Sequence, residues 1–523
     1  MKTVNILSLC VLRALVVYFL VFPCSSAAET SANALYVKHC QSCHGVNRLG
    51  GMGPALLPQN LARLKKDAAK KIIKNGRPAT QMPAFDKVLK KSEQKLLLEY
   101  IYQAPAITPS WTPADIERSH IVHFDTDKLP ASPQFKADPM NLFIVVETGD
   151  HHATVLDGDS FEPIHRFQTR FALHGGPKYS PDGRFVYFAS RDGWISKFDI
   201  YNLKTVAEIR ASINTRNIAV SFDGRYAMVA NYLPHTLVLL DTKSLKPIKI
   251  FDAKNRRGQS SRVSAVYTAP PRSSFIVAFK DIQELWEISY ADNPEPIFEG
   301  LVHDYRMGEG IANKEKFPVR RVMLDDYLDD FFFDSEYNNV IGAARNSKNG
   351  QVVSLIVGRK IADIPLNGMP HLGSGISWQY KDKNVMATPH LQQGAVAVID
   401  MASWEIVKEI ETLGPGFFMR SHDNSRYAWV DVFFGPHRDK VHIIDKASLK
   451  IVKTLKPAPG KTAAHVEFTK DGRYALLSIW DQDGAVVVYD AEKLSEVKRI
   501  PMSKPSGKYN VYNKTHYASG TSH

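Results

Sequence analysis

Cysteine is scarce in this chain, with four in 523 residues. The segment 1–28 reads as a secretory signal, because positive charge at Lys2 and Arg13 accompanies an apolar run and small residues near Ala28. Its removal would leave Cys40 and Cys43 alone. Two cysteines are too few for a disulfide framework or a cysteine zinc site, so we expect an exported, periplasmic protein with another use for its thiols.

Long apolar runs are also missing after this first segment. The alternative that segment 1–28 stays as a membrane anchor is less favoured, since Arg13 interrupts an apolar run that is short for a bilayer. We therefore expect no stable membrane span. The net charge of +12 is spread along the chain without a nucleic-acid-binding module. It fits either a solvated basic surface or attraction to an acidic ligand or redox partner.

The two remaining cysteines stand in "HCQSCHG", residues 39–45, which is the C-x-x-C-H attachment motif of a c-type haem. This motif predicts thioether bonds at Cys40 and Cys43 and iron ligation by His44. Helical apolar spacing follows in "LARLKKDAAKKIIKNG", which ends at Gly76, and again in "KSEQKLLLEYIYQ". Met82 lies in the "TQMPAF" loop between them and is the predicted sixth ligand, with Met52 as competitor. Residues 29–106 are thus predicted to be an all-α class I cytochrome c domain with one haem c.

A proline-rich stretch over residues 107–124 argues against continuous helix or central strand, and we interpret it as a linker. From residue 125 to 523 short alternating strands repeat with polar turns, as in "YSPDGRFVYFAS" and "FTKDGRYALLSI". Eight such units of about 40–50 residues predict an all-β eight-bladed propeller whose first and last blades share strands to close the ring.

A cytochrome c domain joined to an exported eight-bladed propeller resembles the cytochrome cd1 nitrite reductases and their haem d1 maturation relatives. The most specific stretches are "RFALHGG", "GMPHLGSG", "NVMATPH" and "SGKYNVYN". The resemblance implies that the propeller binds haem d1 or its precursor, with His174 as proximal ligand and His371 as distal ligand. Arg170, Arg191 and Arg216 are expected to bind its carboxylates, and Arg420 is a further candidate. The role of His390 stays open.

Three further positions distinguish between the functions found within this family. In "YLDDFFFDS" the second distal histidine of the reductases is replaced, in our alignment, by Asp329. His465 and Tyr509 match a pair near the reacting propionate in the dihydro-haem d1 dehydrogenases of haem d1 biosynthesis. This likeness implies catalytic roles for His371, His465 and Tyr509 in oxidising a propionate of dihydro-haem d1 to an acrylate, with electrons leaving through haem c.

The implied partners are dihydro-haem d1, an external electron acceptor and, transiently, a cytochrome cd1 nitrite reductase. Three alternatives remain open: a nitrite reductase, a non-catalytic haem d1 carrier, and an electron-transfer cytochrome with a protein-binding propeller. Asp329 argues against the first, and the haem c motif argues against a pure carrier, which needs no electron relay.

Overall fold

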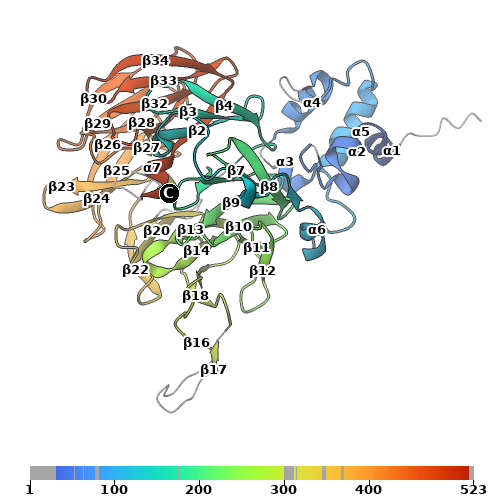
Figure 1. The fold of residues 1–523 in the computed structure, drawn as a ribbon, viewed down its shortest axis with the longest axis horizontal. Helices are drawn as coiled ribbons and strands as arrows, with labels where there is room; N and C mark the ends of the chain where they lie inside the picture. The colour runs from blue at the N-terminus through green and yellow to red at the C-terminus, as the bar shows by residue number, and fades with distance from the viewer. Residues whose placement is uncertain are drawn as a thin grey trace, which may run out of the picture.

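A computed structural model describes residues 31–51, 53–62, 64–76, 82–173, 176–299, 311–313, 315–343, 349–366 and 370–516. The signal segment 1–28, Met52 and His174 lie outside the described residues. A small helical part stands beside a large ring of β-sheets (Figure 1). Within these ranges, no helix is both long enough and apolar enough to cross a bilayer.

The helical part packs around a small apolar core formed by Leu35, Tyr36, Phe85, Leu89 and Leu97. Its elements are α1 (Ala32–His39), α2 (Gln41–His44), η1 (Val46–Arg48), α3 (Pro58–Leu61), α4 (Lys66–Asn75) and α5 (Lys91–Tyr102). The predicted helix end at Gly76 is confirmed, since this residue caps α4 with a φ of +70° that glycine adopts without strain. The helix predicted over 91–103 is confirmed as α5.

Helix α4 begins later than the apolar spacing from Leu61 predicts. It starts at Lys66, and the backbone of Lys65 is extended. The Leu64 carbonyl accepts a hydrogen bond from the Tyr102 hydroxyl of α5, at 2.5 Å, instead of a helical N–H. Tertiary contacts thus override local periodicity and leave Leu61 and Leu64 to line a cavity.

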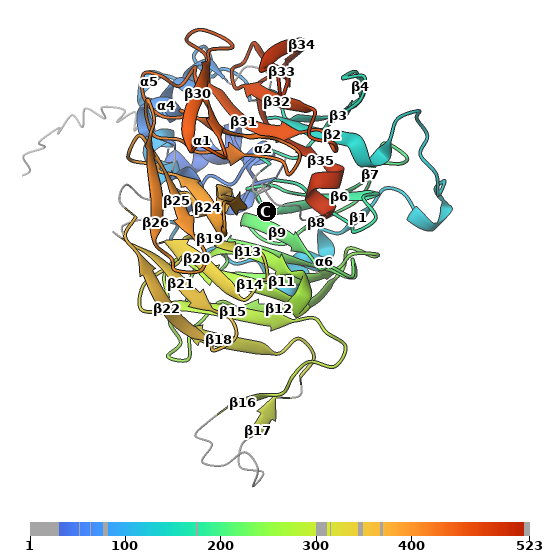
Figure 2. The same ribbon diagram turned by 90° about the vertical axis from the view of Figure 1, so that its left-hand side faces the viewer.

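Seven four-stranded antiparallel sheets and one five-stranded antiparallel sheet form the ring in the described part of the chain, which confirms the predicted eight-bladed propeller (Figure 2). Blade 1 combines β35 (Pro505–Asn510) with β2 (Leu142–Glu147), β3 (His152–Asp157) and β4 (Pro163–Gln168). Blade 2 contains β5 (Lys178–Tyr179), β6 (Phe185–Ala189), β7 (Trp194–Asp199) and β8 (Lys204–Arg210); blade 3 contains β9 (Asn214–Val220), β10 (Tyr226–Leu233), β11 (Thr236–Asp241) and β12 (Pro247–Asp252). Blade 4 contains β13 (Val263–Ala269), β14 (Ser274–Phe279), β15 (Glu284–Ser289) and β18 (Val319–Met323).

The remaining blades follow in chain order. Blade 5 contains β19 (Asp330–Phe333), β20 (Asn339–Ala343), β21 (Gly350–Ser354) and β22 (Arg359–Ile364); blade 6 contains β23 (Ile376–Tyr380), β24 (Lys383–Pro389), β25 (Ala395–Asp400) and β26 (Ile406–Glu411). Blade 7 contains β27 (Met419–Arg420), β28 (Tyr427–Asp431), β29 (Val441–Asp445) and β30 (Lys450–Leu455); blade 8 contains β31 (Ala463–Phe468), β32 (Tyr474–Ile479), β33 (Gly484–Asp490) and β34 (Ser495–Met502). A separate hairpin of β16 (Ile297–Glu299) and β17 (Ile311–Asn313) projects from the ring (Figure 1).

The repeated turn "PDGR" and its relatives have a common hydrogen-bond pattern that explains the periodic sequence. In blade 2 the Ser180 hydroxyl donates to Asp182, at 2.5 Å, and Asp182 accepts the backbone N–H of Arg184, at 3.1 Å. Gly183 between them has a φ of +73°. The same pattern recurs in blades 3 and 8, so each turn fixes where an inner strand ends and the next strand begins.

The ring is closed by strands from the two ends of the propeller sequence, as predicted. Strand β35 pairs with β2, with Tyr509 opposite Ile144 and Lys508 opposite Val145. Helix α7 (Val511–Thr515) follows directly, and Asn510 caps it by accepting the N–H of Asn513, at 3.2 Å. The Asn510 amide also donates to Asn141, at 3.2 Å. One buried side chain therefore joins the closing strand, the last helix and the start of blade 1.

The segment predicted as a linker is more structured than the proline content indicates. It contains α6 (Pro113–Arg118), whose first residue is a proline, and β1 (Ile121–Val122), which extends blade 2 by pairing with β8. Proline lacks an N–H, but the first residue of a helix makes no helical hydrogen bond through its N–H, so proline fits there. A strand at the edge of a sheet can likewise lie close to prolines, because it pairs on one side only. Ile116 of α6 is buried in the core shared by blades 2 and 3.

The helical part and the propeller are joined by a specific interface. Ala55 and Leu57 pack with Ile213 and Leu233 of the propeller in a buried apolar cluster. The Arg210 guanidinium donates to the Leu49 carbonyl and lies over the Trp111 ring, 4.5 Å from its centroid. These contacts fix the orientation of the two parts through both apolar packing and hydrogen bonds.

Asn510→Ala is expected to lower the free energy of unfolding by about 1–2 kcal/mol, because it removes the α7 cap and the contact with Asn141. Chemical denaturation followed by tryptophan fluorescence measures this change. Asn510→Asp retains the capping oxygen, so its free energy of unfolding should fall by less. Equal stability of Asn510→Ala and wild type would contradict a stabilising role for this closure contact.

Candidate functional site

The C-x-x-C-H motif lies on one helical turn that presents its side chains together. Cys40 caps α1, and the His44 N–H donates to the Cys40 carbonyl at 2.8 Å. The Tyr36 hydroxyl is within 3.0 Å of the His44 carbonyl and within 2.7 Å of the Gly45 carbonyl, which fixes the end of the turn. Cys40 and Cys43 form no disulfide in the described residues.

His44 is buried, and its ring orientation is set by a hydrogen bond from Nδ1 to the Pro54 carbonyl at 2.8 Å. With Nδ1 as donor, Nε2 retains the lone pair that an iron ligand needs. A Cβ at Gly53 would stand 3.0 Å from the His44 ring, so the chain passes close to it. This arrangement fits the proximal ligand of a haem c.

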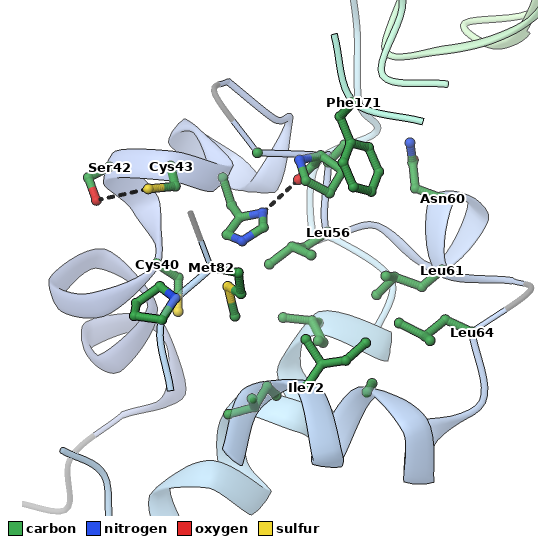
Figure 3. Close-up of a pocket in the computed structure, with 18 of the residues that line it drawn as sticks. Cys40, Ser42, Cys43, Leu56, Asn60, Leu61, Leu64, Ile72, Met82 and Phe171 are labelled. Atoms are coloured by element: carbon green, nitrogen blue, oxygen red, sulfur yellow. Dashed lines mark hydrogen bonds between the residues drawn. The ribbon is translucent and has the colours of Figure 1, made fainter. Parts of the chain in front are cut away.

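A cavity of about 1000 Å³ faces this turn. Cys40, Cys43, His44 and Met82 line it together with apolar side chains from α3, α4 and α5 (Figure 3). The sulfur of Met82 points into the cavity. A mainly apolar space with two thiols, an imidazole and a thioether fits a covalently attached haem, and Met82 remains the predicted sixth ligand.

The propeller completes the wall of this cavity opposite Cys40 and Cys43. In Figure 3, Phe171 lies across the cavity from the two cysteines. His151, whose ring centroid is 4.8 Å from that of Phe171, lines it too. So does Arg191, which was predicted to bind a carboxylate of the second macrocycle. The haem c cavity thus reaches the loops of blades 1 and 2 that lead to the ring opening.

The inner strands of the blades carry a second set of polar side chains around the axis. His371 lies at the junction of blades 5 and 6, next to η6 (Leu372–Ser374). Its Nδ1 is 2.6 Å from the Phe417 carbonyl, and its ring lies 4.1 Å from the Phe417 ring, centroid to centroid. Burial lowers the pKa of His371, so the ring is neutral with Nε2 bearing the lone pair.

The carboxylate that lies near His371 is that of Asp330, the residue after the aligned Asp329. A Cβ at Gly373 of η6 would stand 2.2 Å from Asp330 Oδ2, and the Tyr267 hydroxyl donates to Oδ1 at 2.9 Å. Asp329 instead accepts a hydrogen bond from the Lys280 ammonium, at 3.0 Å. A strand alternates its side chains, so a slip of one residue changes the face that each occupies.

His465 and Tyr509 are brought together from blades 8 and 1, with ring centroids 5.1 Å apart. His465 sits at a bulge of β31, with a φ of +53°, and is buried. Its Nδ1 has no hydrogen-bond partner in the described part of the chain. A Cβ at Gly176 would stand 2.8 Å from the Tyr509 ring, so this pair adjoins the "LHGG" loop whose His174 lies outside the described residues.

Asp431 links the His371 and His465 environments, and sequence reasoning missed it. One carboxylate oxygen accepts the N–H groups of Phe417, at 2.7 Å, and Phe418, at 3.1 Å. The other accepts the N–H of His465 at 3.3 Å. Burial raises the pKa of Asp431 to about 7. The sequence signal for Asp431 was its place as a single acidic residue at the end of the apolar strand "YAWVD". A carboxylate buried in such a strand needs hydrogen-bond partners.

Arg170 and Arg216 differ in their surroundings. Arg170 forms a two-pronged pair with Glu208, at 2.9 and 2.7 Å, and stacks on Trp194. Its guanidinium is therefore largely occupied within the protein. The Arg216 Nε donates to the Ser264 carbonyl at 2.9 Å, and the charges of Tyr232 and Asp330 raise the pKa of Arg216 against the effect of burial.

His390 lies next to the His371 segment. It is fully buried, and its backbone forms a bridge with Pro370, the residue before His371. The pairing supports the backbone of the "GMPHLGSG" stretch.

Sequence and structure comparisons agree with this two-part arrangement. The profile described as "Cytochrome D1 heme domain" matches residues 137–305 and 309–514, and "Cytochrome C oxidase, cbb3-type, subunit III" matches residues 27–101. The "Dihydro-heme d1 dehydrogenase" of Pseudomonas aeruginosa is 55% identical over 95% of this chain and 97% of its own length. The "Nitrite reductase" of Stutzerimonas stutzeri is 26% identical over 94% of each chain.

A solved structure is also similar. "Dihydro-heme d1 dehydrogenase NirN in complex with DHE" superposes with a TM-score of 0.87 at 54% identity. The match covers 92% of this chain and 99% of the chain in the solved structure.

Asp431→Ala is expected to slow turnover at the ring opening by about tenfold or more and to change the absorption spectrum of a bound tetrapyrrole. The reason is that three N–H groups lose their acceptor, at about 1–3 kcal/mol each where they are buried, and both histidine segments lose this support. The turnover rate of Asp431→Asn should lie between those of Asp431→Ala and wild type. The control is Asp423→Asn, an exposed acid of the same blade. A purely structural Asp431 would change thermal stability without changing the spectrum.

Proposed function

The chain belongs to the cytochrome D1 heme domain family, and from this we infer that it is a dihydro-haem d1 dehydrogenase of haem d1 biosynthesis. It oxidises one propionate side chain of dihydro-haem d1 to an acrylate. The observation that carries this function is the His465–Tyr509 pair at the ring opening of a chain that also contains a haem c site. The relative with 55% identity has the same activity in its name.

The reaction breaks one C–H bond on each of two adjacent carbons and forms a C=C bond, so two protons and two electrons leave the substrate. Burial first, and then the charge of Lys508, holds the pKa of His465 well below the usual range, so the ring is neutral and has an unprotonated nitrogen that can accept a proton. Burial raises the pKa of Tyr509 to about 12, so the phenol stays protonated and donates a hydrogen bond.

Haem c, when bound, supplies a one-electron acceptor in the same chain. Cys40 and Cys43 would hold it by thioether bonds, with His44 and Met82 as iron ligands. Since one haem c would hold only one electron at a time, an external one-electron acceptor would have to remove the two electrons in turn. The proximity of Phe171 and His151 to the haem c cavity supports transfer from the ring opening to this cavity.

Substrate binding uses His371 and His174 as axial ligands, with Arg191 and Arg216 near its carboxylates. The position beside His371 that could carry a second imidazole holds the carboxylate of Asp330 instead. This substitution favours the dehydrogenase over a nitrite reductase, in which two distal imidazoles suit the protonation of nitrite.

Further parts of the proposal concern the setting of the protein. The secretory signal over residues 1–28 directs it to the periplasm, and residues 29–106 form an all-α cytochrome c domain. Transient docking to a cytochrome cd1 nitrite reductase would deliver the product. The described helices α1–α5 and the exported character of c-type haem attachment support these assignments.

His465→Ala is expected to slow the conversion of dihydro-haem d1 by about 100-fold or more while changing its binding little, because a positioned base contributes about 10²–10⁴-fold. Anaerobic conversion in the presence of a one-electron oxidant is followed by absorbance. Tyr509→Phe should also slow conversion, whereas Tyr512→Phe on the adjacent helix should not. An unchanged rate in His465→Ala would remove this residue from the mechanism.

Met82→His is expected to lower the midpoint potential of haem c, since a thioether ligand stabilises the reduced iron relative to a second imidazole. A redox titration of the full chain measures the potential. Met140→Leu, in the propeller, is the control and should leave it unchanged. An identical potential in Met82→His and wild type would show that another group is the sixth ligand.

A further inference from the structure

The net charge is concentrated in the haem c part rather than spread along the chain, because the propeller balances its basic residues with acidic ones. Residues 31–104 contain 13 lysines and arginines against 4 acidic residues, which gives a net charge of +9 out of +12 for the whole chain. Residues 105–523 contain 51 basic and 49 acidic residues and are nearly neutral. The small part is therefore electrostatically distinct from the ring.

The lysines of this small part are exposed, and most of them are unbalanced by acids of the same chain. All ten are exposed to solvent. Eight have no carboxylate within 4.0 Å in the ranges that the structure describes, namely Lys38, Lys65, Lys66, Lys70, Lys71, Lys87, Lys90 and Lys91. The other two form exposed pairs, Lys74 with Asp86 and Lys95 with Glu99, each at 3.9 Å. Exposed pairs of this kind contribute only about 0–1 kcal/mol, so the positive charge is available to a partner.

Helix α4 shows that this charge is kept at a cost to the fold. Lys66, Lys70 and Lys74 follow one another at i, i+4 spacing and therefore share one face of the helix. Like charges at this spacing destabilise a helix by about 0.2–0.5 kcal/mol per pair. A different face, with Ala69 and Ile72, lines the haem c cavity. The apolar side of α4 is thus used by the haem c part itself, and its cationic side faces the solvent.

The lysines reach the edge of the haem c cavity that lies away from the propeller. Lys38 lines this cavity together with Cys40. Figure 3 shows Ser42 and Cys43 across the cavity from Phe171, which belongs to the propeller wall. In Figure 1, α1 and α5 lie on the side of the helical part away from the ring. This edge is therefore the one that a second protein can approach.

The Met82 loop borders the same edge and joins the segments that carry the lysines. Pro83 of this loop lines the cavity and is exposed. Phe85 contacts His39 at the end of α1, with ring centroids 6.2 Å apart. The Phe85 N–H also donates to the carbonyl of Ile73, near the end of α4, at 3.1 Å. The end of α1, the Met82 loop and the end of α4 thus form a contiguous surface.

Exposed apolar side chains accompany the lysines of this surface. Val37, 49% exposed, precedes Lys38 on α1, and Val88, 57% exposed, follows Lys87 after the Met82 loop. Protein–protein interfaces commonly combine apolar contacts with a polar, charged rim. The surface therefore has the composition of a docking site for another protein.

We propose that this surface docks the external electron acceptor, and that the acceptor is an acidic one-electron redox protein. Its carboxylates would pair with a lysine face made up of Lys38, Lys70, Lys74 and Lys87. The assignment rests on the proposed function, in which two electrons leave haem c in turn for each substrate molecule. In each encounter one electron passes from reduced haem c to the oxidised acceptor, and no bond forms or breaks. The reduced acceptor then leaves and an oxidised one takes its place.

An acidic protein fits the lysine face better than a membrane of anionic lipid. A lipid surface would match the charge, but it takes up no electron at the haem edge. A helix that lies on a bilayer also needs a free apolar face, whereas Ala69 and Ile72 of α4 face the haem c cavity. Attraction between the lysine face and acceptor carboxylates would raise the association rate, which suits a partner that must bind and leave repeatedly.

The test mixes the full chain, with haem c attached, with an oxidised blue copper protein that has carboxylates around its copper site. Haem c is reduced beforehand with dithionite and desalted, and electron transfer is followed by stopped-flow absorbance. Between about 0.01 M and about 1 M salt the screening length falls from about 30 Å to about 3 Å. Wild type is expected to react about tenfold or more faster at the low-salt end. The double variant Lys38→Glu with Lys87→Glu should lose most of this difference. A wild-type rate that is independent of salt, or that rises with it, would overturn the proposal.

Two controls separate docking from other effects of the substitutions. The double variant Lys408→Glu with Lys450→Glu changes exposed lysines of β26 and β30 by the same total charge and should behave as wild type. The cationic oxidant tris(phenanthroline)cobalt(III) should oxidise haem c of Lys38→Glu with Lys87→Glu at the wild-type rate or faster. Equal slowing in the propeller variant, or slowing with both oxidants, would contradict docking at the lysine face.

Binding gives a readout that needs no electron transfer. Calorimetry with the zinc-substituted form of the same blue copper protein should show a Kd at low salt that weakens by about tenfold or more in Lys38→Glu with Lys87→Glu. Loss of binding to anionic phospholipid vesicles in this variant, with an unchanged Kd for the protein, would assign the face to a membrane and overturn the proposal. Because dithionite supplies the electrons, failure of the chain to oxidise dihydro-haem d1 would overturn only the proposed function.

Discussion

The pairing of β35 with β2 closes the propeller and builds the proposed reaction site at the same time. Hydrogen bonds along this ladder hold the ring shut and set Tyr509 against Gly176. The adjacent Lys508 donates to the His465 carbonyl, so the same strand also supports the bulge that carries the histidine. Because one register fixes all these contacts, a slip of the closing strand would disturb architecture and chemistry together.

Backbone hydrogen bonds, more than direct side-chain pairs, organise the ring opening. His371 is oriented by the Phe417 carbonyl, and the N–H of Phe417 is in turn held by Asp431. His465 is tied to the same carboxylate through its own N–H. The buried carboxylate of Asp431 therefore supports the backbone positions around two histidines from different blades. The two imidazole rings themselves remain available to a ligand, since backbone contacts set their positions.

Much of the fold was predictable because its signals are local. The C-x-x-C-H motif, the helix end at Gly76 and the repeated "DGR" turns each depend on a few neighbouring residues. Contacts between distant residues were less accessible. Asp329 and Asp330 are neighbours with opposite orientations, and only the strand register decides which one meets His371. Sequence spacing likewise could not show that residues 113–122 join blade 2, or that Arg170 is committed to Glu208.

The late position of β35 in the chain has a consequence for biogenesis. Seven blades and most of an eighth are synthesised before the strand that completes the ring, so the nascent propeller has open sheet edges at β2. Such edges favour pairing with other chains until the last strand arrives. Since that strand also brings Tyr509, the proposed reaction site is complete only after the ring has closed, which would make activity a marker of completed assembly.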